Sequence, residues 1–134
     1  MNIGEASRQS GVTAKMIRHY ETLGLIQPAT RTLAGYRVYD EKEVHTLRFI
    51  RRARDLGFSM KEIQHLLGLW QDRRRASGDV RRIARAHVAE LEKKIEELQS
   101  MRRALEALVQ SCHGDERPDC PILEDLAAAA AERG

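Results

Sequence analysis

Apolar residues recur every three or four positions over much of the chain, which predicts a mostly helical protein. Two short helices are expected over residues 3–10 and 14–23, separated by a turn at Gly11, with Thr13 as the N-cap of the second. The inward positions of this pair are expected to be Ile3, Ala6, Val12, Ile17 and Leu23. The second helix then exposes Lys15, Arg18, His19 and Tyr20. Two short helices around a glycine turn are typical of a helix-turn-helix.

The helical pattern is interrupted over residues 25–39. Pro28, Gly35 and the β-favouring pair Val38 and Tyr39 predict a small hairpin with Arg31 near its tip. Two further helices are expected after the hairpin, because each begins with a capping box, a polar cap followed three residues later by glutamate. The pairs are Asp40 with Glu43 and Ser59 with Glu62, and the helices end near residues 56 and 70.

The longest helix is expected over residues 79–110. Its apolar residues are separated by three or four positions, as in a coiled-coil seam: Val80, Ala84, Val88, Leu91, Ile95, Leu98, Met101, Leu105 and Leu108. Such a helix is roughly 45 Å long, and little else in this short chain could cover its stripe. We therefore expect a second copy of the chain to cover it, with packing against the N-terminal helices as the alternative.

Both cysteines follow the long helix. Cys112 lies at its end, and seven residues separate it from Cys120, which directly precedes Pro121, a residue that suits the first position of a helix. That final helix is expected to fray in the alanine run after Leu126. Thiolates are soft ligands, and Cu(I) is a soft ion that is satisfied by two of them, whereas zinc normally takes four ligands. On the residues alone, incidental thiols or an adventitious disulfide are equally open.

Composition and charge refine this picture. The 134 residues are 42% hydrophobic, 32% charged and 4% aromatic, as in a small helical protein. The net charge is +3, but residues 1–85 hold 17 Lys and Arg against 9 Asp and Glu, whereas residues 86–134 hold 6 against 11. The basic part therefore suggests an anionic partner, nucleic acid first. Arg48, Arg51 and Arg52 are expected to form a solvated face, with a weak attraction to DNA as a further possibility.

We expect the protein to be cytoplasmic, with no membrane partner. The N-terminus lacks the apolar run of a signal peptide, and no stretch of about 18 apolar residues could span a membrane. In that compartment two cysteines would not persist as a structural disulfide. An enzyme is not expected, because the chain has neither a Cys–His–acid pattern nor a phosphate-cradling loop.

The assembled motifs resemble the MerR family of bacterial transcription regulators. The N-terminal half carries the runs Ile3–Gly4–Glu5–Ala6, Gly11–Val12–Thr13, Ile17–Arg18–His19–Tyr20–Glu21, Gly24–Leu25–Ile26 and Gly35–Tyr36–Arg37–Val38–Tyr39, followed by Arg54, Gly57 and Phe58. The C-terminal half resembles the copper-efflux regulators of that family in Ile95–Glu96–Glu97–Leu98, the loop from Cys112 to Cys120, and Pro121–Ile122. The resemblance covers nearly the whole chain.

The resemblance implies a mainly α protein in four parts. These are a winged helix-turn-helix DNA-binding domain over residues 1–70, a connector over 71–78, a dimerisation helix over 79–110 and a metal-binding loop with a short helix over 111–134. It also implies a homodimer held by an antiparallel coiled coil of the long helices. Such a dimer binds double-stranded promoter DNA and acts on RNA polymerase there, activating copper-efflux and detoxification genes when metal binds.

The second helix of a helix-turn-helix enters the major groove. Arg18 is our first candidate for a base or phosphate contact, because guanidinium suits both. The further DNA-binding candidates are Lys15, Tyr20, Arg31, Tyr36, Arg37 and Arg54. The alternative for Tyr20 and Tyr36 is a place in the core with only the hydroxyl group in water.

Metal selectivity is expected to follow from charge and ligand number. Two thiolates with one monovalent ion carry a charge of −1, which the N-terminus of the final helix can stabilise. Divalent-sensing relatives place a third cysteine where this chain has Ser77. Cu(I) is therefore expected at Cys112 and Cys120, with Ag(I) or Au(I) possible. The alternatives are a zinc-type divalent sensor that adds His113 and, from another class, a metal-storage protein or chaperone.

Overall fold

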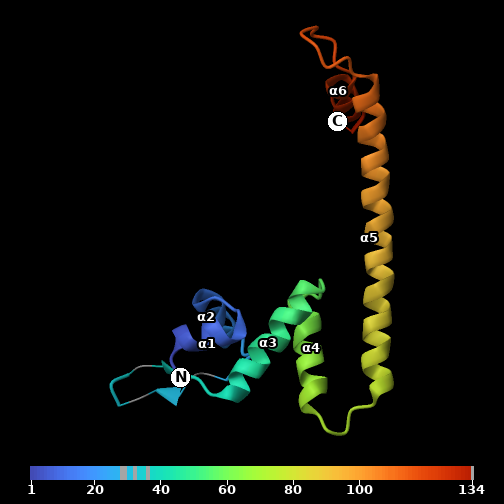
Figure 1. Cartoon of the computed structure of the whole chain (residues 1–134). Coiled ribbons are helices and arrows are strands. Elements are labelled where there is room, and N and C mark those ends of the chain that lie inside the picture. Colours follow the sequence, from blue (N-terminus) through green and yellow to red (C-terminus); the bar gives the residue numbers. More distant parts are fainter. Residues whose placement is uncertain (28–29, 32, 36, 134) are drawn as a thin grey trace. The chain divides into compact units, whose positions relative to one another are not determined.

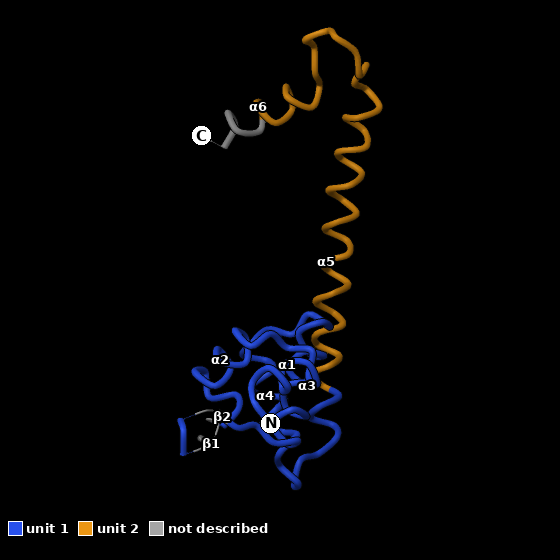
Figure 2. The backbone as a smooth tube through the Cα atoms, turned by 60° about the vertical axis from the view of Figure 1, so that its left-hand side comes forward, with its two compact units in different colours: residues 1–81 blue, residues 82–134 orange. Residues whose placement is uncertain are grey.

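The computed structural model describes residues 1–27, 30–31, 33–35 and 37–133. It confirms a mainly helical chain with one small hairpin (Figure 1). The elements are α1 (Ile3–Ser10), α2 (Ala14–Thr22), β1 (Thr30–Arg31), β2 (Arg37–Val38), α3 (Glu41–Asp55), α4 (Met60–Gln71), α5 (Ser77–Ser111) and α6 (Pro121–Arg133). They divide into two compact units, residues 1–81 and 82–134, and the boundary falls inside α5 (Figure 2). The four-part division stays a prediction.

Unit 1 surrounds a single apolar core to which α1 to α4 contribute. Its buried side chains are Ala6, Val12, Ile17, Tyr20, Leu25, Ile26, Tyr39, Val44, Leu47, Ile50, Ala53, Ile63 and Leu67. Trp70 is 42% exposed and stacks on Phe49, with ring centroids 4.7 Å apart. The inward placement of Leu23 is wrong: this residue is the C-cap of α2 and is 41% exposed, because the chain leaves the helix there.

The helix starts in unit 1 are those that the polar caps predict. The Thr13 hydroxyl accepts a hydrogen bond from Met16 N at 3.2 Å, at the start of α2. Both capping boxes are formed, and in the first the Asp40 N–H donates to a Glu43 carboxylate oxygen at 2.6 Å. Each cap satisfies a backbone N–H group that lacks a partner within its helix.

Unit 2 consists of most of α5, a loop and α6. The loop reverses the direction of the chain at the end of α5 (Figure 2). The expected fraying of α6 after Leu126 is wrong, because the helix continues to Arg133. Alanine has the highest helix propensity of any residue, so an alanine run extends a helix that is already started. None of the described helices is both long and apolar enough to cross a membrane.

Candidate metal loop and nucleic-acid interface

The helix-turn-helix is built from α1, a turn at Gly11 and α2. Gly11 has a φ of 75°, a conformation that favours glycine, and its N–H donates to Ser7 O at 2.9 Å to close α1. Ile17 and Tyr20 are the buried residues of α2. The helix consequently leaves Lys15, Arg18 and His19 exposed, as the sequence predicted.

The structure corrects the predicted exposure of Tyr20. Its side chain is only 2% exposed, and its hydroxyl oxygen accepts a hydrogen bond from Arg54 Nη1 at 2.9 Å. Tyr20 therefore anchors an exposed arginine of α3 beside α2. No sequence signal could have revealed this contact, because the two residues are 34 positions apart.

The hairpin contains two further candidate residues. β1 and β2 pair in antiparallel register, and Arg31 is the backbone partner of Arg37. Tyr36, the remaining candidate of this segment, lies outside the described residues.

The two cysteines lie at the end of one helix and at the start of the next. Cys112 follows α5, and its N–H donates to Leu108 O at 3.1 Å and to Val109 O at 3.2 Å. Cys120 is the N-cap residue of α6, since its carbonyl oxygen accepts from Glu124 N at 3.1 Å. Both thiols are free and half-buried.

The loop between the cysteines has an internal ion pair. Arg117 donates from its backbone N–H and from Nε to the Asp115 carboxylate, at 2.9 and 2.8 Å. These hydrogen bonds hold the pKa of Asp115 below its usual range, mainly through the Arg117 side chain. Because Asp115 is already neutralised by Arg117, it is a poor candidate for a metal ligand. His113 and Asp119 are exposed.

The donor set of this loop fits a soft cation. Two free thiols, each at a helix end, are the strongest soft ligands that the described residues offer here. The sequence holds only these two cysteines, so a tetrahedral thiolate site cannot form within one chain. Ser77, the residue predicted to influence selectivity, is the exposed first residue of α5 and belongs to unit 1.

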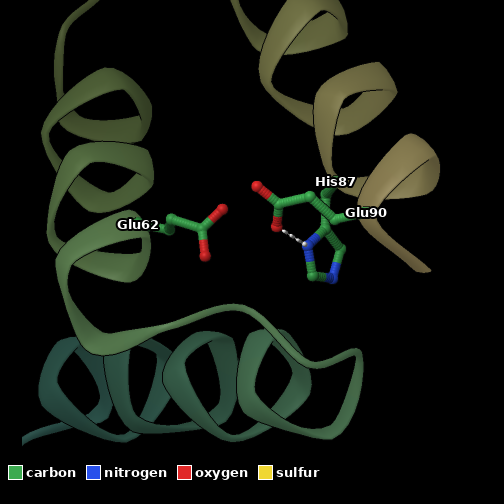
Figure 3. A group of neighbouring side chains, drawn as sticks. All are labelled: Glu62, His87 and Glu90. Atoms are coloured by element: carbon green, nitrogen blue, oxygen red, sulfur yellow. Dashed lines mark ion pairs between the residues drawn. The ribbon is translucent and has the colours of Figure 1, made fainter. Parts of the chain in front are cut away.

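A histidine near the beginning of α5 escaped the sequence analysis. His87 is 5% exposed, and its Nδ1 lies 3.9 Å from a carboxylate oxygen of Glu90, one helical turn away (Figure 3). The spacing of three residues between these side chains was the available sequence signal. Glu62, the third residue in the same view, completes the capping box of α4 through its contact with Ser59 N at 2.9 Å.

Comparisons with known proteins agree with this architecture. The family model described as MerR HTH family regulatory protein matches residues 1–69, and the one described as MerR, DNA binding matches residues 44–108. Heavy metal-dependent transcription regulator 2 of Rhizobium meliloti (strain 1021) is 60% identical over 132 residues, covering 98% of this chain and 90% of the relative. The regulator CueR of Escherichia coli O157:H7 is 44% identical, covering 99% and 98%.

A solved structure extends the likeness to three dimensions. The transcription regulator PbrR691 from Ralstonia metallidurans CH34, in complex with lead(II), is 33% identical and superimposes with a TM-score of 0.80, covering 94% of this chain and 98% of that one. Fold and comparisons together define a DNA-binding transcription regulator and not an enzyme. The chain belongs to the MerR family of helix-turn-helix regulatory proteins.

Proposed function

We propose that this protein is a homodimeric transcription activator that responds to Cu(I), with Ag(I) and Au(I) as substitutes, and controls copper-efflux and detoxification genes. The observation that carries the proposal is the pair of free, half-buried thiols at the end of α5 and at the N-cap of α6. The names of two relatives, a heavy metal-dependent regulator and CueR, support a metal effector.

Ligand number and charge support a monovalent ion. Two thiolates with a +1 ion form a centre of charge −1, and Cys120 lies at the positive end of the α6 dipole. A divalent ion with two thiolates is neutral and gains less from that field. The third thiol that divalent-sensing relatives use is serine here, at Ser77.

Promoter binding rests on the basic surface of unit 1. Lys15 and Arg18 lie on the exposed side of α2, and Arg54, held by Tyr20, lies beside it. In a helix-turn-helix, such a helix enters the major groove while its flanks contact phosphates. Arg31 and Arg37, which are backbone partners in the hairpin, extend this set through the wing.

The homodimer is supported by the seam of α5. Six seam residues of one protomer are exposed large hydrophobics: Val88, Leu91, Ile95, Leu98, Met101 and Leu105. Leaving such a stripe in water is costly, and a second α5 offers the same stripe at matching length. An antiparallel pairing buries both stripes together.

In this proposal the loop between the two cysteines, the thiol loop, binds the metal, and the promoter DNA changes its conformation in response. When Cys112 and Cys120 share one ion, the loop and α6 become ordered and dock against the dimer body. Arg75, just before the long helix, and Ser77, its first residue, respond to that docking, and the DNA-binding units twist the promoter for RNA polymerase. The ion shifts the dimer between two states because it binds one of them more tightly than the other.

The second candidate is a divalent sensor of the same family. It is favoured by the structural likeness to PbrR691, which was solved with lead(II). Such a site would recruit His113, which is exposed between the two cysteines, as a third ligand.

Transcription in vitro from a promoter bound by the protein distinguishes these candidates. We expect Cu(I) to activate the wild type, and Cys112→Ser or Cys120→Ser to abolish activation while promoter binding persists. Zn(II) and Pb(II) serve as the divalent arms. Activation by either of them, with no response to Cu(I), would refute the monovalent proposal.

A further inference from the structure

A basic cavity lies where the end of α1 meets the outer face of α3. Its lining comprises Arg8, Gln9, Ser10 and Gly11 on one side and Arg48, Arg51, Arg52 and Asp55 on the other, around a volume of ≈ 380 Å³. The α3 members recur at spacings of three, four and seven residues, so they form one stripe along the helix. All of them belong to unit 1.

Two contacts hold arginine side chains in this cavity. Arg48 Nε donates to Gln9 O, the carbonyl group near the end of α1, at 3.0 Å. The guanidinium group of Arg51 lies against Gly11, where a Cβ atom would come within 1.7 Å of Arg51 Nη1. A side chain at position 11 would therefore displace the Arg51 guanidinium group from its place against the turn.

The cavity has more positive charge than its own acids neutralise. Asp55 is the only carboxylate in the lining, and it lies 4.0 Å from Arg51 Nε, at the outer limit of an ion pair. Arg8 is paired with Glu5. Within the described residues, neither Arg48 nor Arg52 is paired with a carboxylate. In this part of the chain the positive charges of Arg48 and Arg52 are thus left without an acidic partner, and that of Arg51 is only weakly paired.

A neighbouring cavity connects this cluster with the recognition helix. Its lining includes Thr13, Met16 and Tyr20 of the α2 segment together with Arg51 and Arg54. Gly11, Arg51 and Asp55 line both cavities, so Arg51 lies between the end of α1 and the flank of α2. When α2 lies in a major groove, the turn before it runs beside the sugar–phosphate backbone.

We propose that Arg51, with Arg48 and Arg52 beside it, binds a phosphate of the DNA backbone at the helix-turn-helix turn. This inference rests on the proposed DNA-binding function and adds a contact to it. Guanidinium matches phosphate geometry with two parallel hydrogen bonds. Phosphate contacts fix the register of a protein on DNA without reading sequence. Arg51 is thus a positioning contact for α2.

The test is a titration of the full-length, reduced protein against a duplex selected for binding from a random-sequence pool. Fluorescence anisotropy at several salt concentrations gives affinity and salt dependence together. We expect Arg51→Ala to weaken binding about 10-fold and to reduce the slope of log K against log salt by about 0.9, the value for one lost phosphate contact. Binding to an unselected duplex of mixed sequence should weaken by the same factor.

Arg74→Ala is the matched control, because Arg74 is an exposed arginine of unit 1 outside both cavities. This variant loses the same charge, so it measures how much of the change in DNA affinity comes from non-specific electrostatic attraction. Arg51→Lys keeps the charge and stem but loses the paired hydrogen bonds, and an intermediate affinity is expected. Circular dichroism shows whether each variant is folded. If Arg51→Ala is not, the DNA affinities of Arg51→Lys and Arg48→Ala decide the result.

Affinity and slope for Arg51→Ala equal to those of Arg74→Ala would overturn the phosphate site. So would normal DNA binding combined with lost activation, which would assign the cluster to an acidic protein partner. Failure of the wild type to bind any duplex would instead refute the proposed function itself.

Discussion

The hydroxyl of Tyr20 illustrates how one buried side chain can organise an exposed one. Its oxygen holds Arg54 Nη1 at 2.9 Å, at the edge of the proposed DNA interface. An unrestrained arginine loses much rotational freedom when it binds a phosphate. Anchoring the guanidinium group in advance reduces that cost, so we expect a residue that is only 2% exposed to contribute to DNA affinity.

We therefore expect Tyr20→Phe to weaken DNA binding by about 3-fold, because a hydrogen bond to a charged group is lost from the free protein. Thermal unfolding should change little, since the ring remains in the core. The measurement is a double-mutant cycle with Arg54→Ala. If Tyr20→Phe weakens binding equally in the presence and absence of Arg54, Tyr20 does not act through Arg54.

The exposed imidazole of His113 separates the two metal hypotheses. A two-coordinate ion at Cys112 and Cys120 has no need of it, whereas a divalent ion would use it as a third ligand. His113→Ala should leave Cu(I) affinity unchanged, as measured by competition with a Cu(I) chelator. The control is Asp119→Ala, the other exposed candidate ligand in the loop. A loss of about 10-fold or more with His113→Ala alone would argue for a third ligand.

At the scale of elements, the first turn of α3 combines a capping box with crowded negative charge. Burial raises the pKa of Glu43 above its usual value, and the nearby carboxylates of Asp40 and Glu21 act in the same direction. The hydrogen bond from the Asp40 N–H opposes this shift without cancelling it. The ionised form of Glu43 is thus less favourable in the folded protein than in the unfolded chain.

The consequence is a specific dependence of stability on pH. As pH rises from the usual pKa of glutamate to the raised pKa of Glu43, the unfolded chain releases its proton first, so the free energy of unfolding falls. Glu43→Gln keeps a side chain that can complete the capping box but does not titrate. We expect the variant to match the wild type at acid pH and to exceed its stability above that interval, in urea unfolding at a series of pH values.

A difference between the two proteins that is independent of pH, or that favours the wild type as pH rises, would contradict this account. Asp79→Asn, in the first turn of α5, is a matched control for removing an acid near a helix start.

The elements show which features a sequence can predict. Helix starts followed from local chemistry, because Thr13, Asp40 and Ser59 cap their own helices within three residues. The predicted end of α6 was wrong, because an alanine run contains no polar residue that indicates where a helix stops. Features that depend on contacts between distant segments were not predictable, among them the burial of Tyr20 and the guanidinium of Arg51 against Gly11. The cysteines were found because they are rare. The position of Cys120 followed from Pro121, and that of Cys112 followed from the end of the apolar pattern of the long helix.

At the scale of the whole molecule, the seam of α5 determines whether two chains act together. Leu98 is 63% exposed in one protomer and lies within the proposed interface. A charge at this position would be buried without a partner in both copies of a symmetric dimer. We expect Leu98→Glu to weaken dimerisation at least about 100-fold and to reduce promoter affinity with it. Analytical ultracentrifugation measures the first effect.

Gln99→Glu adds the same charge at the next, exposed position of α5 and should leave the dimer intact. A dimer that survives Leu98→Glu would show that the seam is covered in another way.

A dimer that senses metal at one end of α5 and binds DNA through unit 1 must obey thermodynamic linkage. If metal binding at Cys112 and Cys120 favours the dimer state that twists the promoter, DNA held in that twisted form must raise metal affinity by the same factor. We expect a coupling of about 5- to 150-fold, the usual range for such systems. The measurement is the Cu(I) affinity of the reduced dimer, determined by competition with a chelator. It is made without DNA, with a straight promoter duplex, and with a promoter duplex that a mismatched segment makes easier to twist. The flexible duplex should give the tightest Cu(I) binding. Cys120→Ser should bind both duplexes as the apo protein does, with no response to Cu(I). Equal Cu(I) affinity in all three conditions would mean that the thiol loop and the promoter are not coupled, even if each binds its ligand.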